Sequence, residues 1–248
     1  MPSAAEPEPE PVLVLCGGRG TRLQEHGQSI PKPLVEIGGM PIVWHVVRIY
    51  AAQGHTRIWL LTGYQGDRID AFVASAPWPA GVEVECLDTG LDTPTGGRVL
   101  QAGSLVHDER FAVTYGDGLA DVDLGALRAF HTGHGGLASV TLVRPELPFG
   151  IATVSPDGLV TGFAEKPRSE HWVNGGFFLF EPGVLDYLEP DSVLERRPLE
   201  RLVADEQLRG HRHDGFWRCM DTYKDAVQLN DLWAAGAARW AGSDQGPK

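Results

Sequence analysis

Apolar residues fall into two kinds of segment that alternate through the first half of the chain. Residues 12–16 form a short continuous apolar run that ends in glycines, the pattern of a strand buried on both faces. From Pro41 the apolar residues recur at helical spacing as far as Gly54, and a proline at the start with a glycine past the end is typical of a helix. The same rhythm predicts strands at 57–62, 82–87, 111–115 and 138–144 and helices at 67–75, 98–107 and 123–132. This β-α-β-α order predicts an α/β fold, a mostly parallel sheet with helices on both faces.

The second half of the chain is less regular and richer in predicted strands. Residues 151–154 and 159–164 flank the turn sequence Ser155-Pro156-Asp157-Gly158, and this arrangement predicts a hairpin. A further strand is predicted at 173–180, and helices are predicted at 194–208 and 222–238.

The chain has no internal repeat and no linker long enough to separate two domains. We therefore expect a single domain over residues 11–240, with a small β-rich lobe. In residues 1–10 prolines and glutamates alternate, which predicts a disordered acidic tail. Residues 241–248 are expected to form a C-terminal tail.

Charge and composition narrow the classes of partner. The formal net charge is −12, whereas nucleic acid and anionic membrane surfaces require a broad basic face, so neither is expected as a partner. A phosphorylated small molecule needs only a few cations and backbone N–H groups, so that class stays open. No apolar run approaches the roughly 18 residues of a membrane span. The three cysteines are far apart and form no Cys-x-x-Cys, which favours a reduced, cytoplasmic setting.

A loop rich in glycine and arginine follows the first predicted strand, with the sequence Gly17-Gly18-Arg19-Gly20-Thr21-Arg22. Glycines let the backbone approach a ligand closely, and the arginines add charge-assisted donors, which suits a polyphosphate. The glycine spacing fits neither the dinucleotide-binding motif nor the P-loop. A flexible basic loop is the alternative, but ligands bind at the carboxyl ends of strands in open α/β sheets, so a phosphate site is favoured. Ten residues later, Lys32 stands between two prolines that stiffen its backbone.

Asp117 follows an apolar strand and lies between two glycines. Its carboxylate is therefore expected to project into a ligand crevice, although a Gly-Asp-Gly sequence is also common in simple turns. Mg²⁺ in proteins takes one or two carboxylates together with phosphate oxygens and water. A magnesium site here would accordingly need a second acid.

Further motifs accompany the loop above along the chain: Pro31-Lys32-Pro33-Leu34, Tyr115-Gly116-Asp117-Gly118, Glu165-Lys166-Pro167, Asn174-Gly175-Gly176-Phe177-Phe178 and Gly215 to Thr222. Taken in order, these segments resemble the signature of the sugar-1-phosphate nucleotidyltransferases, and most of all the glucose-1-phosphate cytidylyltransferase branch. The resemblance spans residues 12 to 240. Each motif is weak alone, and the ordered set is specific. It implies a Rossmann-like nucleotidyltransferase fold, with the β-rich lobe on the sugar side, and Mg²⁺-dependent transfer from an NTP to a sugar 1-phosphate with release of pyrophosphate.

The resemblance also implies a role for individual residues. Asp117 and Asp221 are expected to hold Mg²⁺, although Asp221 could instead cap the following helix. The catalytic cations are expected to be Arg22, Lys32 and Lys166, with Lys166 on the sugar phosphate or, alternatively, an exposed charge at a hairpin end. Nucleotide contacts are expected from Gly17, Gly18, Arg19, Gly20, Thr21, Thr95, Gly96, Gly97 and Arg98, and sugar contacts from Glu165, Asn174, Gly175 and Gly176. Residues 93–98 could equally form an ordinary Gly-Pro loop, and the two glycines after Asn174 a β-bulge.

The resemblance specifies the type of reaction more closely than it specifies the two substrates. Cys16 and Trp172 depart from the residues expected at their positions, and Trp172 is expected to reshape the sugar pocket. CTP and glucose 1-phosphate are the substrates predicted here; dTTP, UTP or GTP, and a heptose or cyclitol phosphate of an antibiotic pathway, are the alternatives. A non-catalytic regulatory subunit that binds a sugar nucleotide is the alternative from another class. Homo-oligomerisation is expected by analogy with the family.

Overall fold

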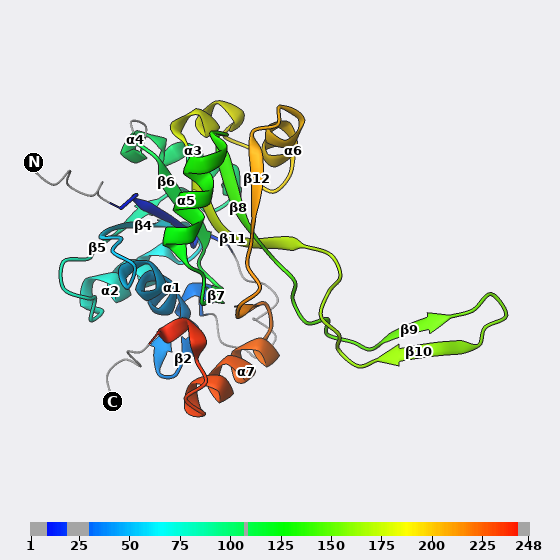
Figure 1. The fold of residues 1–248 in the computed structure, drawn as a ribbon. Coiled ribbons are helices and arrows are strands. Elements are labelled where there is room, and N and C mark those ends of the chain that lie inside the picture. The colour runs from blue at the N-terminus through cyan, green and yellow to red at the C-terminus, as the bar shows by residue number, and fades with distance from the viewer. Residues whose placement is uncertain (1–8, 19–29, 107–108, 243–248) are drawn as a thin grey trace, which may run out of the picture.

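A seven-stranded sheet forms the centre of the molecule in the computed structural model, which describes residues 9–18, 30–106 and 109–242 (Figure 1). The strand order is β12-β8-β11-β6-β1-β4-β5. The strands are β1 (Val12–Leu15), β4 (Arg57–Thr62), β5 (Glu83–Asp88), β6 (Phe111–Tyr115), β8 (Ala138–Val143), β11 (Val173–Phe180) and β12 (Leu208–Arg212).

Most neighbouring strands in this sheet are parallel, as the alternation of elements predicts. The parallel pairs are β12–β8, β6–β1, β1–β4 and β4–β5. Only β11 runs antiparallel to its neighbours β6 and β8. The carboxyl ends of β1, β4, β5 and β6 therefore meet at one edge, where ligands bind in sheets of this kind.

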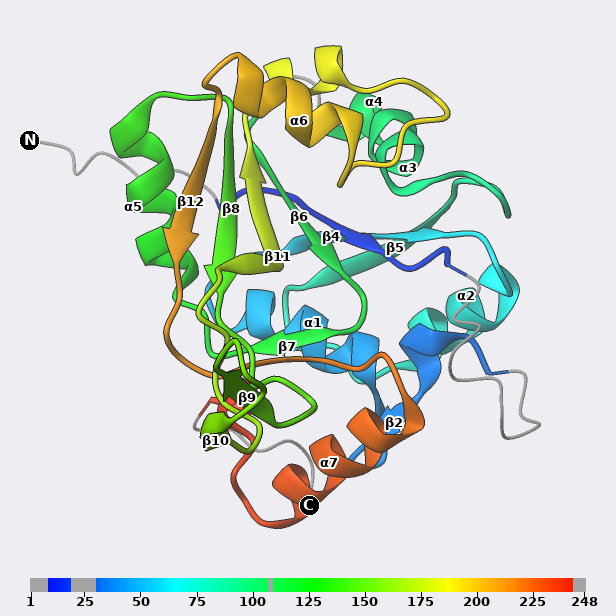
Figure 2. The ribbon, with the colours of Figure 1, turned by 90° about the vertical axis from the view of Figure 1, so that its right-hand side faces the viewer.

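Helices cover both faces of the sheet (Figure 2), because side chains along each central strand alternate between two cores. Val12 and Val14 pack in the core that includes α1, whereas Leu13 packs in the core that includes α3 and α4. The helices are α1 (Ile42–Ala51), α2 (Gly66–Ser75), α3 (Thr95–Gln101), α4 (Gly103–Val106), α5 (Leu124–His134), α6 (Arg197–Ala204) and α7 (Tyr223–Ala234). Short 3₁₀ turns lie at Lys32–Leu34, Pro182–Tyr187 and Arg239–Ala241.

Two predicted helices differ from the observed ones. The helix predicted at 98–107 is two short helices, α3 and α4, which meet at Gly103 against the side chain of Leu185. The helix predicted at 194–208 is only α6, and its last predicted residue, Leu208, begins strand β12. Glu206 adopts a left-handed backbone with a φ of 56° just before that strand. Pairing with β8 then decides the conformation of a polar segment whose own pattern does not indicate a strand.

The predicted hairpin is confirmed, and it forms an arm that projects from the body of the molecule (Figure 1). The arm consists of β9 (Ile151–Val154) and β10 (Val160–Ala164). Two smaller antiparallel ribbons lie nearer the body: β2 (Glu36–Ile37) with β3 (Met40–Pro41), and β7 (Gly118–Ala120) with β13 (Trp217–Cys219).

The chain is already packed at Glu10, within the segment predicted to be a tail. Its side chain is buried, and the carboxylate accepts a charge-assisted hydrogen bond from Arg128 at 2.5 Å. The division into one domain and two tails otherwise stays a prediction. Within the described ranges, no helix has the length and apolar character that crossing a membrane requires.

Candidate functional site

Two aspartates that are far apart in the sequence meet beside the carboxyl end of β6. Asp117 lies between the end of β6 and the start of β7. Strand β7 pairs with β13, and β13 ends two residues before Asp221. The N–H of Met220 also donates to the carbonyl of Asp117 at 2.9 Å. Ligand atoms of Asp117, Asp221 and Cys219 consequently lie within 4.8 Å of one another. The structure thus brings together the two acids predicted to hold a metal.

Asp221 is not the cap of the following helix. The N-cap of α7 is Thr222, whose hydroxyl accepts from the N–H of Asp225, while the Asp225 carboxylate accepts from the N–H of Thr222. This capping box satisfies the helix terminus without the Asp221 carboxylate. The Asp221 carboxylate thus takes no part in the capping box.

A cation already bridges the two acids. The 3₁₀ turn at Lys32–Leu34 places the Lys32 Nζ at 2.5 Å from Asp117 Oδ2 and 2.7 Å from Asp221 Oδ1. Burial alone lowers the pKa of Lys32, but the charge of Asp117 and the hydrogen bonds to both carboxylates together raise it above its ordinary value. The ammonium therefore stays charged and occupies the position that a metal ion between these carboxylates requires.

The donor set of this cluster fits a hard divalent cation. Carboxylate oxygens are the protein ligands that Mg²⁺ prefers, and its remaining positions are filled by phosphate and water. Cys219 is a soft donor, but burial, followed by the negative charge of Asp117, raises the pKa of its thiol. A neutral thiol is a poor ligand for a hard cation, so the donors of this cluster that fit one are the two carboxylates.

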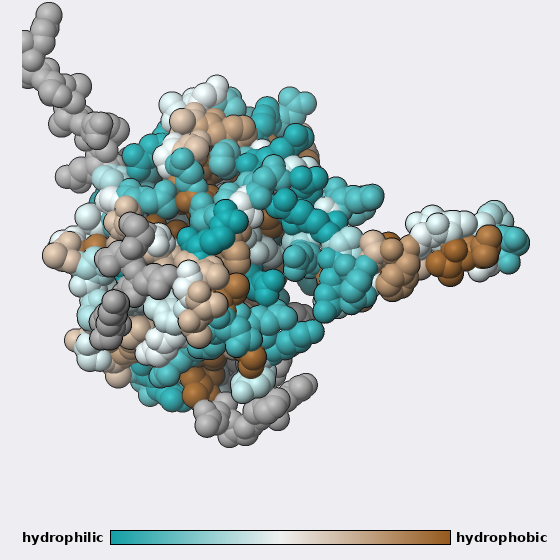
Figure 3. Space-filling view, turned by 60° about the horizontal axis from the view of Figure 1, so that its bottom comes forward, coloured by the Kyte–Doolittle hydropathy of each residue, from teal (hydrophilic) through white to brown (hydrophobic). Residues whose placement is uncertain are grey.

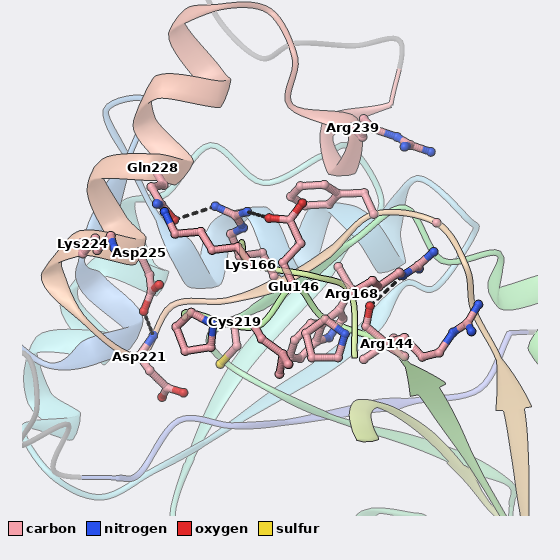
Figure 4. A pocket seen from close by; sticks show the side chains of 18 of the residues that line it. Arg144, Glu146, Lys166, Arg168, Cys219, Asp221, Lys224, Asp225, Gln228 and Arg239 are labelled. Atoms are coloured by element: carbon pink, nitrogen blue, oxygen red, sulfur yellow. Dashed lines mark hydrogen bonds and ion pairs between the residues drawn. The ribbon is translucent and has the colours of Figure 1, made fainter. Parts of the chain in front are cut away.

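A pocket of about 840 Å³ has Asp221, one of the two aspartates, in its wall (Figure 4). Its walls come from the end of β8 and the segment after it, the segment after β10, residues 214–219 and 221–222, the first turns of α7 and Arg239. Six cations line it, together with a smaller number of acids, so the pocket suits an anion. These cations are Arg144, Lys166, Arg168, Arg218, Lys224 and Arg239.

Lys166 lines this pocket in a strained conformation. Its φ is 45°, in the left-handed region that non-glycine residues rarely adopt. Its side chain is 52% exposed, and its Nζ lies 3.9 Å from Glu165 Oε1. Strain of this kind concentrates at ligand-binding sites. Arg144 is a second cation of the pocket wall. Its guanidinium carbon lies 4.7 Å from the centre of the Trp172 ring, so Trp172 helps to position Arg144 in the pocket.

Of the predicted phosphate loop, only Gly17 and Gly18 are described; Arg19, Gly20, Thr21 and Arg22 lie outside the described residues. Gly17 is buried, and a Cβ there would lie only 2.0 Å from Nη1 of Arg98. Glycine is thus required for the close approach of this loop to Arg98.

Arg98 holds loops together in the structure, and the nucleotide contact expected of it stays a prediction. It is only 4% exposed. Its guanidinium donates to the carbonyls of Gly17, Thr62 and Leu91 and to the hydroxyl of Thr89. These acceptors follow or end β1, β4 and β5, so Arg98 fixes three strand ends relative to one another.

Gly96 and Gly97 also have a packing role, and the base contact expected of this segment stays a prediction. Both are buried, and a Cβ on Gly97 would lie 2.1 Å from the carbonyl oxygen of Pro190. The Gly97 N–H donates to the carbonyl of Ser192 at 3.2 Å, so it is not directed at a ligand. The segment 189–195 therefore docks on the start of α3.

Asn174, Gly175 and Gly176 form the β-bulge that the sequence left open, because the register of β11 against β8 shifts between Asn174 and Phe178. The Asn174 amide donates to Tyr115 Oη at 3.0 Å, and its carbonyl accepts from the N–H of Gly176 at 2.8 Å. Gly176 has a φ of 76° and lies against the Tyr115 ring. The bulge fixes the orientation of the Asn174 amide beside Tyr115.

Sequence reasoning did not identify two residues that connect Asn174 to Thr95, namely Tyr115 and Glu195. Tyr115 donates to Glu195 Oε1 and Thr95 donates to Glu195 Oε2, both at 2.7 Å. Tyr115 precedes Gly116-Asp117, so that motif could have identified it. Glu195 lies in a segment without a motif, and only the fold brings it here.

Three comparisons with known proteins bear on this site. The family model described as nucleotidyl transferase matches residues 11–237. The probable glucose-1-phosphate cytidylyltransferase of Bacillus subtilis (strain 168) is 40% identical, with 92% of this chain and 98% of the relative covered. The glucose-1-phosphate cytidylyltransferase of Salmonella typhi is 37% identical, with 92% and 97% covered. The crystal structure of a putative glucose-1-phosphate thymidylyltransferase from Bacillus anthracis has a TM-score of 0.70 and 21% identity, covering 97% of this chain and 98% of that one.

Proposed function

Because this chain belongs to the nucleotidyl transferase family, we propose that it transfers a cytidylyl group from CTP to glucose 1-phosphate, releasing pyrophosphate and CDP-glucose. The reaction class is that of sugar-1-phosphate nucleotidyltransferases, and the two substrates follow the names of the cytidylyltransferase relatives. The observation that carries the proposal is the Asp117–Asp221 pair beside a pocket lined with cations.

The proposed metal is Mg²⁺, held by Asp117 and Asp221. When bound there with a nucleotide, Mg²⁺ neutralises charge on the phosphate oxygens. Lys32 contacts both carboxylates, so its ammonium would have to move aside for a metal ion held between them. Its long side chain then reaches the phosphates that the same site holds, where an ammonium stabilises the departing pyrophosphate.

Besides holding the metal, the site has to align two anions, the sugar phosphate and the triphosphate. The sugar phosphate is itself the nucleophile, so no general base is needed, and positioning with electrostatic stabilisation carries the reaction. Lys166 is proposed to hold the sugar phosphate, supported by its position on the pocket wall. Glu165 and Asn174 are proposed to contact sugar hydroxyls. Arg22 and the undescribed part of the loop are proposed to bind the triphosphate, while Gly17 and Arg98 shape the base of that loop.

The experiment is a pyrophosphate-release assay with purified protein. CTP, UTP, dTTP, ATP and GTP are each combined with Mg²⁺ and with glucose 1-phosphate, a heptose 1-phosphate or a cyclitol phosphate. Release with CTP and glucose 1-phosphate at the highest kcat/KM supports the proposal. If another pair gives faster pyrophosphate release, the proposed substrates are wrong but the proposed reaction stands. If no pair gives release, the proposed reaction is wrong.

A non-catalytic regulatory subunit is the competing class of function. Loss of the metal acids or of the phosphate-binding lysines would be expected in such a protein. Here Lys32, Asp117, Asp221 and Lys166 are all present, and the first three are in contact. This arrangement supports the enzyme.

We also propose that the chain forms a homo-oligomer through its β9–β10 arm. The arm carries large exposed apolar side chains, among them Phe163 at 69%, Leu159 at 64% and Val160 at 56% (Figure 3). An isolated two-stranded hairpin is marginally stable in water, and exposed apolar surface of this kind is typical of interfaces. Size-exclusion chromatography with light scattering should give a smaller mass for Phe163→Ser with Val160→Ser than for wild type. Val203→Ser is the matched control, because Val203 is also an exposed apolar residue but lies on α6. A monomeric wild-type protein would contradict this proposal.

The compartment that we propose is the cytoplasm. All three cysteines are free thiols, a state that a reducing compartment maintains.

A further inference from the structure

A chain of hydrogen bonds links two residues that the family resemblance assigns to different substrates. At one end is Thr95, at the start of α3 in the segment expected to meet the nucleotide. At the other is Asn174, at the start of β11, expected to meet the sugar. The carboxylate of Glu195 lies between them and accepts from the Thr95 hydroxyl with Oε2 and from the Tyr115 hydroxyl with Oε1, each at 2.7 Å.

The direction of every bond in this chain is fixed by chemistry. Asn174 Nδ2 can only donate, so Tyr115 Oη accepts from it and its own proton goes to Glu195. The hydroxyl of Thr95 accepts from the N–H of Leu194 at 2.9 Å, so its proton also goes to Glu195. Both ends of the chain thus depend on the two acceptor oxygens of one carboxylate.

The surroundings keep this arrangement intact. The side-chain oxygen of Asn174 accepts a hydrogen bond from the N–H of Gly176, and this bond fixes the orientation of the side-chain amide. Tyr115 is also two residues from Asp117, so the chain runs beside the proposed metal ligand.

We propose that Glu195 is a positioning residue that couples binding of the nucleotide to binding of the sugar 1-phosphate. The inference rests on the proposed function and assigns its two subsites a physical connection. A ligand that orders Thr95 at one end restricts Glu195 and Tyr115, and so prepares Asn174 for the other ligand. Each substrate then tightens the binding of the other, by the same factor in both directions.

Glu195→Gln and Tyr115→Phe test this role. Glutamine keeps the shape of Glu195 but replaces one acceptor oxygen with an NH₂ group, so one of the two hydroxyls loses its acceptor. Phenylalanine keeps the Tyr115 ring and removes both bonds at its hydroxyl. Glu200→Gln is the matched control, because Glu200 is also exposed and lies on α6, outside the chain of hydrogen bonds.

The primary measurement is calorimetric titration of α,β-methylene-CTP, which does not react, with Mg²⁺ and with or without saturating glucose 1-phosphate. In wild type and Glu200→Gln the sugar phosphate should lower the Kd of the analogue by roughly fivefold or more. In Glu195→Gln and Tyr115→Phe this ratio should fall to about one. The double variant should behave like either single variant, because both interrupt the same chain. Melting temperatures within a few degrees of wild type will show that the variants are folded.

The outcomes separate this proposal from the function on which it rests. If wild type releases pyrophosphate with another nucleotide and sugar phosphate, the titration uses the analogue of that pair. An active wild type with no coupling, or variants that keep wild-type coupling, overturns the role of Glu195 alone. A wild type without activity towards any pair overturns both proposals.

Discussion

His45 should make the stability of this protein depend on pH. The residue lies on α1, is 2% exposed and packs edge-on against the rings of Trp44 and Trp233. Its Nε2 lies 2.8 Å from the carbonyl of Ile37, and its Nδ1 lies 3.3 Å from Trp240 Nε1, which can only donate. The neutral ring with its proton on Nε2 therefore satisfies both contacts, and a second proton on Nδ1 would face an N–H donor.

The size of the change in the free energy of unfolding follows from the pKa of His45. Burial lowers the pKa of His45 from 6.5 to about 4, with a smaller contribution from the charge of Arg48, against the favourable hydrogen bond to Ile37. The folded state therefore binds fewer protons than the unfolded state between these two values. The stability contributed by neutral His45 is complete above pH 6.5 and is lost as the pH falls towards 4. At pH 5.0 the loss is about 2 kcal/mol, from roughly 1.4 kcal/mol per pH unit.

The assay compares the free energy of unfolding at pH 7.5 and pH 5.0, by denaturant titration, in wild type and His45→Gln. Glutamine can donate to Ile37 and accept from Trp240, and it does not titrate. The other histidines with lowered pKa values, such as His55 and His131, contribute equally to both proteins and cancel in the difference. The fall between the two pH values should be about 2 kcal/mol larger in wild type. Equal falls in the two proteins would refute the argument, whatever the variant costs at pH 7.5.

The remaining predictions concern the proposed site. Asp117→Asn and Asp221→Asn should each lower kcat by about a hundredfold or more while the fold is kept, and near-normal turnover in both would remove the metal assignment. Lys32→Met should tighten Mn²⁺ binding without nucleotide by about tenfold, measured by electron paramagnetic resonance, since the competing ammonium is gone; unchanged binding would contradict displacement. Lys166→Ala should raise KM for the sugar phosphate far more than for the NTP, and equal rises would place Lys166 elsewhere. Competition among equal concentrations of NTPs should favour CTP by roughly a hundredfold, because a wrong base leaves buried groups unpaired; a preference for GTP or dTTP would contradict this.

Local patterns determined the elements whose apolar spacing is regular. Strand β4 and strand β11 have the predicted bounds, and the hairpin at 151–164 lies where its turn sequence placed it. These segments were predictable because the period of buried side chains is a property of the local chain. The glycine-flanked Asp117 was identifiable for the same reason, since it directly follows such a segment.

Tertiary structure decided the features that depend on distant partners. Leu208–Arg212 is polar and becomes a strand only because β8 offers an edge to pair with. Arg98 resembles a ligand-binding cation in sequence, but three loops converge on it and use its donors. Lys32 reaches Asp221 across 189 positions, and Glu195 reaches Tyr115 across 80. Hydrogen bonds and ion pairs between such residues leave no periodic trace in the chain, because they depend on where the fold brings each side chain.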